Sequence, residues 1–370
     1  MTSLLLALML PAQADDVQIS GYVRPVFQGV YRPTAVPLDQ REIRLGTSLG
    51  GVIFDGQVTD NWSFRSHLRL GVGTVSVLTG VGTVDTNNDG EVDGVVSSNG
   101  EAIGQIVREA AVTYSPIDEL SIRAGRLKVP FTSQAQASDT ALLFSERAGP
   151  GRIFHADDDL GALMLVNMAD RVTTSLGVFN GEGMGVDPVD TRGAVYMSRV
   201  DVHPFGSFEF DESHPQGQDF RLGFGGGLIW HAYTAFDSAG YDNIFVGDLR
   251  ASGSVRLAVA GLSVSGEVLY RLQRDDLTDR PIQATGAFGQ AGWRTPIGFE
   301  PIFRIGSLIE DQTFAPRTTR WLEGGMNYYP QQQSDDPNAI RYSVQYTGEN
   351  RITEQEVAHG IIALVQLIWN

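Results

Sequence analysis

The stretch that decides the fold is LSVSGEVLYRLQ, residues 262–273, in which apolar and polar side chains alternate. Leu262 and Val264 fall on one face of an extended chain, and Glu267 and Arg271 fall on the other. A two-residue period of this kind is typical of a strand with one apolar face, so the chain is predicted to be all-β. The same alternation recurs in three further stretches, residues 17–28, 61–72 and 340–347.

A soluble sandwich also has strands with one apolar face, but three features favour a barrel that crosses a membrane. The expected strands are about ten residues long, as a tilted strand crossing a bilayer requires. Short connections such as 57–60 alternate with long ones such as 76–104, which is typical of short periplasmic turns and longer extracellular loops. Aromatic residues such as Trp62 and Trp369 lie near expected strand ends, which suits the membrane interface. Residues 15–370 are therefore predicted to form one transmembrane antiparallel β-barrel.

We expect about 16 strands, since single-chain bacterial barrels have an even number. The connection at 206–218 should be periplasmic but is long for a turn, so a miscounted strand there is the main topological alternative. The strands are expected to begin near residues 17, 42, 61, 105, 119, 158, 171, 193, 219, 243, 262, 282, 299, 317, 338 and 359.

The composition excludes several classes of function. The 370 residues include no cysteine, so no disulfide, thiolate nucleophile or cysteine–metal site is possible. The net charge of −17 at pH 7 argues against a nucleic-acid partner, which would call for a basic face. The sequence has no His-Glu-x-x-His motif and no P-loop, and its six histidines are scattered, so we expect no enzymatic activity.

Residues 1–14 have the features of a secretory signal peptide. An apolar run from Leu4 to Leu10 precedes Ala12-Gln13-Ala14, a small-x-small cleavage box. Together with the barrel pattern, this segment predicts export to the bacterial outer membrane. The alternative is a disordered apolar N-terminus.

Short motifs in the middle of the chain resemble the phosphate-selective porin O and P family. The resemblance implies a 16-stranded outer-membrane barrel, usually trimeric, whose third loop folds into the lumen. Two features depart from the family: Lys128 is the sole lysine, whereas phosphate channels of the family use lysine at the entrance, and the terminal residue is Asn370 rather than an aromatic. The motifs are GRLKVPF at 125–131, LFSER at 143–147, DLG at 159–161, GVFNG at 177–181, and Arg199-Val200 followed by Pro204.

The 27-residue connection 131–157 is the candidate for that third loop. Pro130 removes a ladder donor and should end the preceding strand. The stretch 135–147 could form a short helix, capped by Ser138 or Asp139. A glycine cluster inside a later strand, Gly223 to Gly227, would leave room on the wall for a packed loop. Inside the lumen the loop would narrow the pore; the alternative is a loop lying over the barrel mouth. The charges expected at the constriction are Asp139, Glu146, Arg147 and Asp159.

Basic side chains recur on the polar face of the alternating strands. On a barrel that face lines the water-filled lumen, where a ring of arginines would favour anions. The alternative is that the arginines pair with acids such as Glu109, Asp201, Asp248 and Glu267 and merely brace the wall. The predicted pore-lining residues are Arg24, Arg44, Arg65, His67, Arg69, Arg123, Lys128, Arg271, Arg304 and Arg341.

An acidic stretch at 85–93 resembles the front of a calcium-binding loop, with Gly90 at its sixth position. The glutamate expected at the twelfth position is missing, and a plain Asp/Asn/Gly turn is the alternative. The candidate calcium ligands are Asp85, Asn87, Asp89, Glu91 and Asp93.

The sequence therefore predicts a porin, a passive water-filled channel for small ions and hydrophilic solutes, in which the lumen arginines would favour anions. Its expected partners are membrane lipid, lipopolysaccharide and two further copies of the chain in a homotrimer. The alternative is an outer-membrane barrel with a structural or adhesive role that uses the acidic calcium-type loop.

Overall fold

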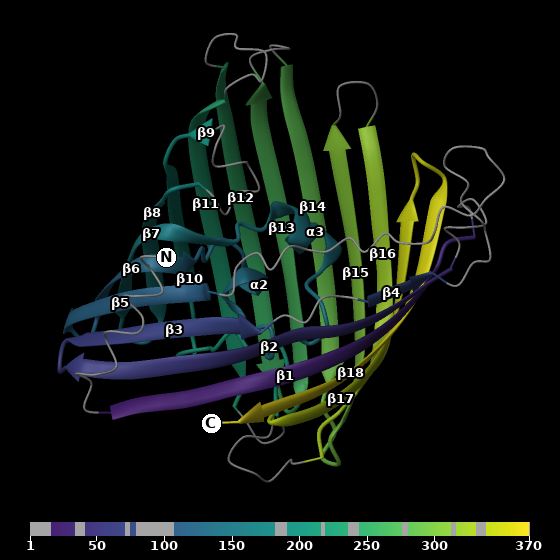
Figure 1. Ribbon diagram of the computed structural model, residues 1–370, viewed down its shortest axis with the longest axis horizontal. Helices are drawn as coiled ribbons and strands as arrows, with labels where there is room; N and C mark the ends of the chain where they lie inside the picture. Colours follow the sequence, from purple (N-terminus) through teal and green to yellow (C-terminus); the bar gives the residue numbers. More distant parts are fainter. Residues whose placement is uncertain are drawn as a thin grey trace, which may run out of the picture.

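In the computed structural model the chain forms one antiparallel sheet that closes on itself, because the first and last strands pair with each other (Figure 1). The structure describes residues 16–33, 41–70, 75–78, 107–181, 191–215, 219–235, 244–275, 280–311, 316–330 and 338–369. The elements in chain order are β1 (Asp16–Tyr31), β2 (Arg41–Thr59), β3 (Trp62–Leu70), β4 (Val75–Leu78), β5 (Val107–Ile117), β6 (Leu120–Lys128), α2 (Ser133–Gln136), α3 (Gly149–Phe154), β7 (Asp158–Met168), β8 (Val172–Phe179), β9 (Thr191–Arg192), β10 (Val195–Val202), β11 (Arg221–Ala235), β12 (Ile244–Val259), β13 (Leu262–Asp275), β14 (Arg280–Trp293), β15 (Phe299–Asp311), β16 (Pro316–Tyr328), β17 (Ile340–Arg351) and β18 (Glu356–Trp369).

The strand segments make up sixteen barrel strands. Segments β3 and β4 both pair with β2, and β9 and β10 both pair with β11, so each of these two couples is one interrupted strand. The predicted 16-stranded barrel is confirmed, and each strand begins within about three residues of its expected position. The connection near 206–218 hides no miscounted strand among its described residues.

The exposed outer face of the strands is mainly apolar, and many of their buried inward side chains are polar or charged, the reverse of a soluble protein. In β15, Phe303 is 51% exposed and its neighbour Arg304 is 1% exposed. Phe299, Ile305 and Ile309 share the outer face with Phe303. Such an apolar outer band is what a bilayer solvates favourably.

The barrel has a short-turn end and a long-loop end. Ala169 to Arg171 join β7 to β8, and Ala260 and Gly261 join β12 to β13. Ala169, Asp170, Ala260 and Gly261 have positive φ between 47° and 82°. Short turns with positive φ match the right-handed twist of the strands they join. Asp16 pairs with Gln57, close to the β2–β3 turn, so the described chain begins at this same end.

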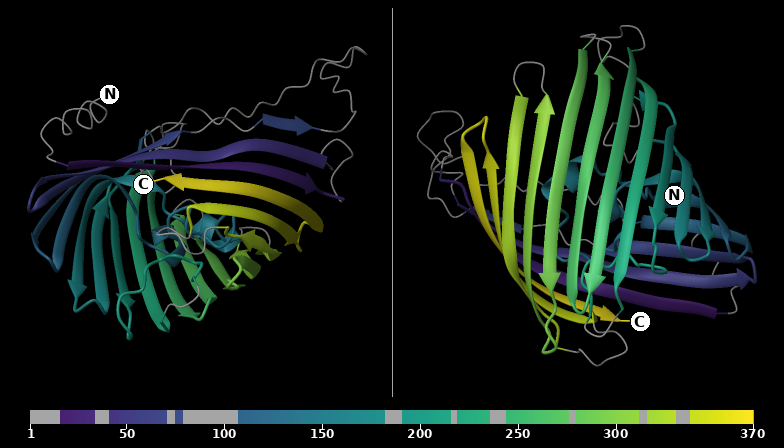
Figure 2. Two further views of the ribbon diagram at one scale, coloured as in Figure 1. Left: turned by 90° about the horizontal axis from the view of Figure 1, so that it is seen from below. Right: turned by 180° about the vertical axis from the view of Figure 1, so that it is seen from behind.

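The inner loop, residues 129–157, lies inside the ring of strands and not over the mouth. Figure 1 shows α2 and α3 between the wall formed by β1–β3 and the wall formed by β11–β16, and Figure 2 shows the same arrangement from two other sides. Phe131, Phe144 and Phe154 of this loop are at most 1% exposed. A side chain at Gly227 would collide with the carbonyl of Phe131, so this glycine leaves room for the loop, as predicted.

The helix expected within 135–147 does not form there. The short helix α2 begins earlier, because the Thr132 hydroxyl caps it by accepting from the Ala135 N–H at 2.9 Å. Ala137 is extended and ends it, and Ser138 and Asp139 cap no helix. The second helix, α3, follows only after this stretch.

Candidate functional site

Side chains of the barrel wall donate hydrogen bonds to the backbone carbonyls of the inner loop from many directions. Most donors are arginines, whose bonds contribute about 1.5–3 kcal/mol each because the donor is charged. The loop is therefore fixed by its backbone rather than by its side chains alone. The pairs, donor first, are Arg24 and Ser145, Arg199 and Phe131, Arg250 and Phe154, Arg304 and Glu146, Asn327 and Leu143, Arg341 and Leu142, and Gln366 and Thr140.

These bonds explain why residues 137–147 are not helical. A helix would use the carbonyl of each residue for the N–H four positions later. Here Lys128 and Arg147 take the carbonyl of Ala137, at 2.7 and 3.4 Å, and wall side chains take several of the carbonyls that follow. The stretch consequently runs as an extended, irregular segment along the wall.

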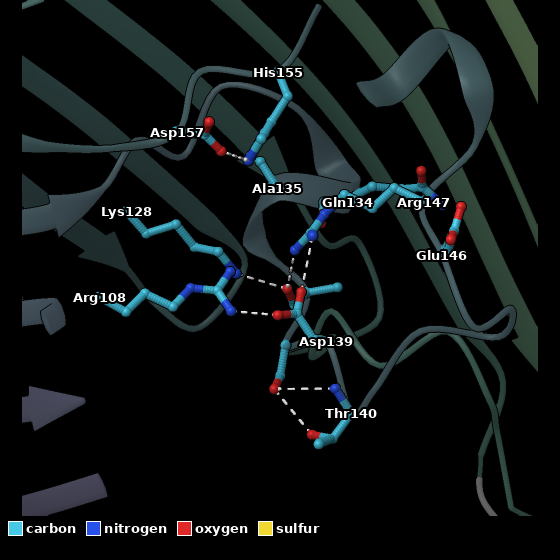
Figure 3. A network of polar contacts seen from close by, with 12 residues as sticks. Arg108, Lys128, Gln134, Ala135, Asp139, Thr140, Glu146, Arg147, His155 and Asp157 are labelled. Atoms are coloured by element: carbon cyan, nitrogen blue, oxygen red, sulfur yellow. Dashed lines mark hydrogen bonds and ion pairs between the residues drawn. The ribbon is translucent and has the colours of Figure 1, made fainter. Parts of the chain in front are cut away.

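A compact charge cluster joins the inner loop to the β5–β6 wall (Figure 3). Asp139 lies at its centre, only 5% exposed, and forms ion pairs with Arg108 of β5 and with Arg147 of the loop, the latter at 2.8 Å. Lys128, at the end of β6, lies near the same carboxylate. Arg108 also contacts Asp158 at 3.1 Å. Around Asp139, three cations thus face one carboxylate.

Burial of Asp139 alone would raise the pKa of its carboxyl group, but the surrounding charges act more strongly. The fields of Arg147 and Arg108, the hydrogen bond from Arg108 and the field of Lys128 together hold this pKa well below its usual range. Asp139 is therefore ionised at any pH at which the barrel is expected to work.

Arg108 escapes the alternation rule because its strand is irregular. Simple alternation from Glu109, which faces the lumen, places Arg108 on the lipid side. The pairing of β3 with β5 skips Arg108, since His67 pairs with Glu109 and Leu68 with Val107. A bulge of this kind turns one extra side chain inward, and only the two adjacent charges at 108–109 hint at it in the sequence.

The comparisons with known proteins agree with this architecture. The model of the family described as "Phosphate-selective porin O and P" matches residues 52–187, which confirms the resemblance seen in the sequence. The chain is therefore similar to this family over just over a third of its length. No curated protein sequence matches the chain.

Solved structures share the fold of this chain at low sequence identity. The anion-selective porin from Comamonas acidovorans has a TM-score of 0.63 at 12% identity, covering 96% of this chain and 99% of that one. The loop L8 deletion mutant of OmpT from Vibrio cholerae has a TM-score of 0.59 at 12% identity, covering 96% and 100%. The outer-membrane channel DcaP of Acinetobacter baumannii has a TM-score of 0.56 at 10% identity, covering 96% and 97%.

Several wall arginines of the barrel pair with acids, as in the alternative to an open ring of arginines. Each pair joins neighbouring positions on the inner face, and the same arginines often also hold the loop. Arg304, for example, binds Glu323 with two nitrogens while its third nitrogen reaches the loop. The pairs are Arg123 with Glu109, Arg199 with Asp201, Arg250 and Arg271 with Asp248, and Arg304 with Glu323.

A second group of basic side chains remains accessible to water in the barrel. Arg65, 46% exposed in β3, forms a bidentate pair with the similarly accessible Asp55 at 2.8 and 3.0 Å. Arg65 and Arg123 line one recess in the wall. Arg69, four residues after Arg65 in β3, is also exposed. These arginines can meet a solute, unlike the buried arginines that hold the loop.

A second cavity, of about 200 Å³, lies between the inner loop and the wall formed by β15–β18 and β1. Glu146 and Arg147, two of the predicted constriction residues, line this cavity, and Arg147 also bonds within the loop. Its charges are mixed: Arg32, Arg152 and Arg351 alternate with Glu146, Glu323 and Glu349.

Other predicted site residues lie in different places. Asp159 is not part of the loop: it is the second residue of β7, and its carboxylate accepts from the N–H groups of Leu160 and Gly181, both at 2.7 Å. It therefore fixes the wall where the β8–β9 connection begins. His67 faces Tyr22 across the sheet, 3.4 Å from its hydroxyl. Arg44 lies in β2, but its side chain is outside the described part.

The signal segment 1–14 and the calcium ligands at 85–93 also lie outside the described residues. Within the ranges that the structure describes, no group of three or more acidic or histidine side chains could hold a metal ion. No helix in those ranges is long and apolar enough to cross a membrane.

Proposed function

We propose that this protein is an outer-membrane porin, a passive diffusion channel for small hydrophilic solutes that prefers anions. The observation that carries the proposal is the cluster around Asp139, where Arg108, Lys128 and Arg147 outnumber the carboxylate they share. Arg24 and Arg341 stand close enough to each other and to this cluster for their charges to interact. A surplus of positive charge at the narrowest part of a pore lowers the energy of an anion there and raises that of a cation.

The arginines have two roles in the proposed channel. The buried ones hold the inner loop in place, and so set the width of the lumen. Arg65, Arg69 and Arg123 stay accessible on the β3 and β6 wall, where guanidinium groups can bind the oxygens of a carboxylate or phosphate. An anion would pass between these wall groups and the loop without any covalent step.

Two similarities support this proposal without deciding the solute. The matched family is described as phosphate-selective, and the porin from Comamonas acidovorans is described as anion-selective. Since Lys128 is the only lysine, arginine rather than lysine would supply the attraction for anions in this chain.

We also propose that the porin assembles as a homotrimer in contact with lipid and lipopolysaccharide. OmpT of Vibrio cholerae, which has a similar fold, is described in a trimer form. The apolar outer band of β14–β18, including Phe303 and Val344, could serve either a neighbouring copy or the bilayer. Cross-linking of the protein in native membranes would distinguish a trimer from a monomer.

The test of the channel proposal is the current through purified protein in a planar bilayer. Stable conductance steps are expected, and the reversal potential under a salt gradient should shift toward that of chloride. A reversal potential shifted toward that of potassium would contradict the anion preference but would still indicate a channel. Absence of steps would contradict the channel and favour the structural or adhesive alternative.

A further inference from the structure

The connection between β10 and β11 enters the barrel from the short-turn end and does not hang outside it. Arg256 of β12, 7% exposed, holds it by donating to the carbonyls of Phe208 and Glu209, the latter at 2.8 Å. The rings of Phe208 and Phe210 also lie against this guanidinium, 4.6 and 4.0 Å from its carbon to the ring centres. Such cation–π contacts are strongest when they are shielded from water.

Beyond this anchor, Glu212 makes three hydrogen bonds to the inner loop. One carboxylate oxygen accepts from the side-chain amide of Gln134 at 2.8 Å, and the other accepts from the N–H of Leu143 at 2.8 Å. The N–H of Glu212 itself donates to the carbonyl of Ala141 at 3.0 Å. A single residue therefore binds two parts of the loop that are nine positions apart in sequence.

Gln134 connects Glu212 to the charged residues Arg147 and Asp139. Its side-chain oxygen accepts from the N–H of Ala148 at 2.9 Å, and its backbone carbonyl accepts from Arg147 at 3.1 Å. Arg147 in turn pairs with Asp139. The carboxylate of Glu212 thus closes residues 134–148 into one lobe that carries the charge cluster.

The next residue of the connection continues the contact to the opposite side of the lobe. The hydroxyl of Ser213 donates to Glu300 of β15 at 2.7 Å. Asn327 of β16 bonds the same glutamate and the carbonyl of Leu143, both at 2.9 Å. Leu143 is thereby held by its N–H from one side and by its carbonyl from the other.

We propose that the β10–β11 connection is the second half of the constriction, and that Glu212 is the positioning residue that sets where the inner loop stands. This proposal rests on the proposed channel function, which it deepens by assigning the control of pore width to a segment from the short-turn end. The wall arginines hold the loop against the barrel, and Glu212 fixes its inner edge from below.

The first experiment records single channels of the wild type, Glu212→Ala and Glu209→Ala in a planar bilayer. Glu212→Ala removes two charge-assisted bonds, and loss of even one should raise the population of displaced loop about 10- to 100-fold. We expect frequent partial closures and noisier open-channel current in Glu212→Ala. Glu209 is exposed three residues away and carries the same charge, so its variant should behave like the wild type. Glu212→Gln keeps one acceptor oxygen and should lie between the two.

A second measurement does not depend on current. Hydrogen exchange of the folded barrel in detergent should show faster exchange at residues 137–147 in Glu212→Ala than in Glu209→Ala, with the strands equally protected. Equal exchange and equal noise in these two variants would overturn the assignment of Glu212. A wild type without conductance would instead overturn the channel proposal, while the exchange comparison would still test the clamp.

Discussion

The guanidinium of Arg304 donates to the carbonyl of Glu146, 2.9 Å away, while its other nitrogens bind Glu323. One wall side chain therefore joins the barrel wall to the inner loop and neutralises a neighbouring acid. The same group lies over the ring of Phe144, 4.2 Å from its centre. In this protein, the first role of the wall arginines is to hold an irregular backbone segment inside the barrel.

The Arg304→Met variant should be markedly less stable than the wild type. It leaves Glu323 buried without its cation, and removing one partner of a buried pair lowers the free energy of unfolding by about 3–5 kcal/mol. Denaturant unfolding in lipid vesicles measures the change. Arg152→Met, whose pair with Glu146 is about half exposed on both sides, should change stability by no more than about 1 kcal/mol. If the two variants were equally stable, Arg304 would not be holding the loop.

The Arg65→Glu and Arg69→Glu changes should weaken the preference for anions. Both side chains are accessible on the inner wall, and a glutamate at 65 would face Asp55 and add to a negative patch. The reversal potential should move toward that of the cation. Arg320→Glu is the matched control, because Arg320 is exposed on β16 beside the inward Trp321 and so lies on the outer face. Equal shifts in all three variants would place the filter elsewhere.

Protonation of Asp139 should loosen the inner loop only in strong acid. Because its pKa is lower in the folded protein than in the unfolded chain, its contribution is complete above the unfolded value of about 3.9. It is lost as the pH falls through the lower folded value. Exchange at residues 137–147, corrected for the intrinsic rate, should be constant from pH 7 to about 4 and rise below that. Asp139→Asn should show the faster exchange at every pH; a wild-type transition near pH 6 would contradict this account.

The Gly227→Ala change should displace the inner loop. Its Cβ would collide with the carbonyl oxygen of Phe131, a backbone atom that cannot swing aside. Overpacking of this kind lowers stability by about 1–3 kcal/mol. The control is Gly289→Ala, because a Cβ at Gly289 meets no atom within 4 Å. Unfolding of both variants in vesicles provides the comparison, and an unchanged Gly227→Ala would mean that the loop does not rest on this strand.

Much of this architecture follows from local pattern. Alternation over about ten residues determines which side chains face the lipid. This pattern alone predicts that Arg24, Arg304 and Arg341 lie on the inner face, and all three are buried there. The strand end at Lys128 and the long connection after Pro130 likewise indicate an inserted loop.

Which inner side chains hold the loop and which stay accessible depends on contacts between parts of the chain that are distant in sequence. Helix propensity in 135–147 is overridden because the loop carbonyls find charged donors on β1, β15 and β17, which no local signal reveals. The bulge at Arg108 reverses the side that alternation predicts for that residue.

By itself, then, the sequence determined the strands, the direction of their faces and the place where the chain turns into the lumen. These depend on the two-residue period and on turn residues, which act over a few positions. The tertiary structure alone decided which arginines hold the loop, which stay open to a solute, and that Glu212 closes the lobe from the other end. Those outcomes depend on the closure of the barrel, since it brings residues 226 positions apart within hydrogen-bond distance, as with Gln366 and Thr140.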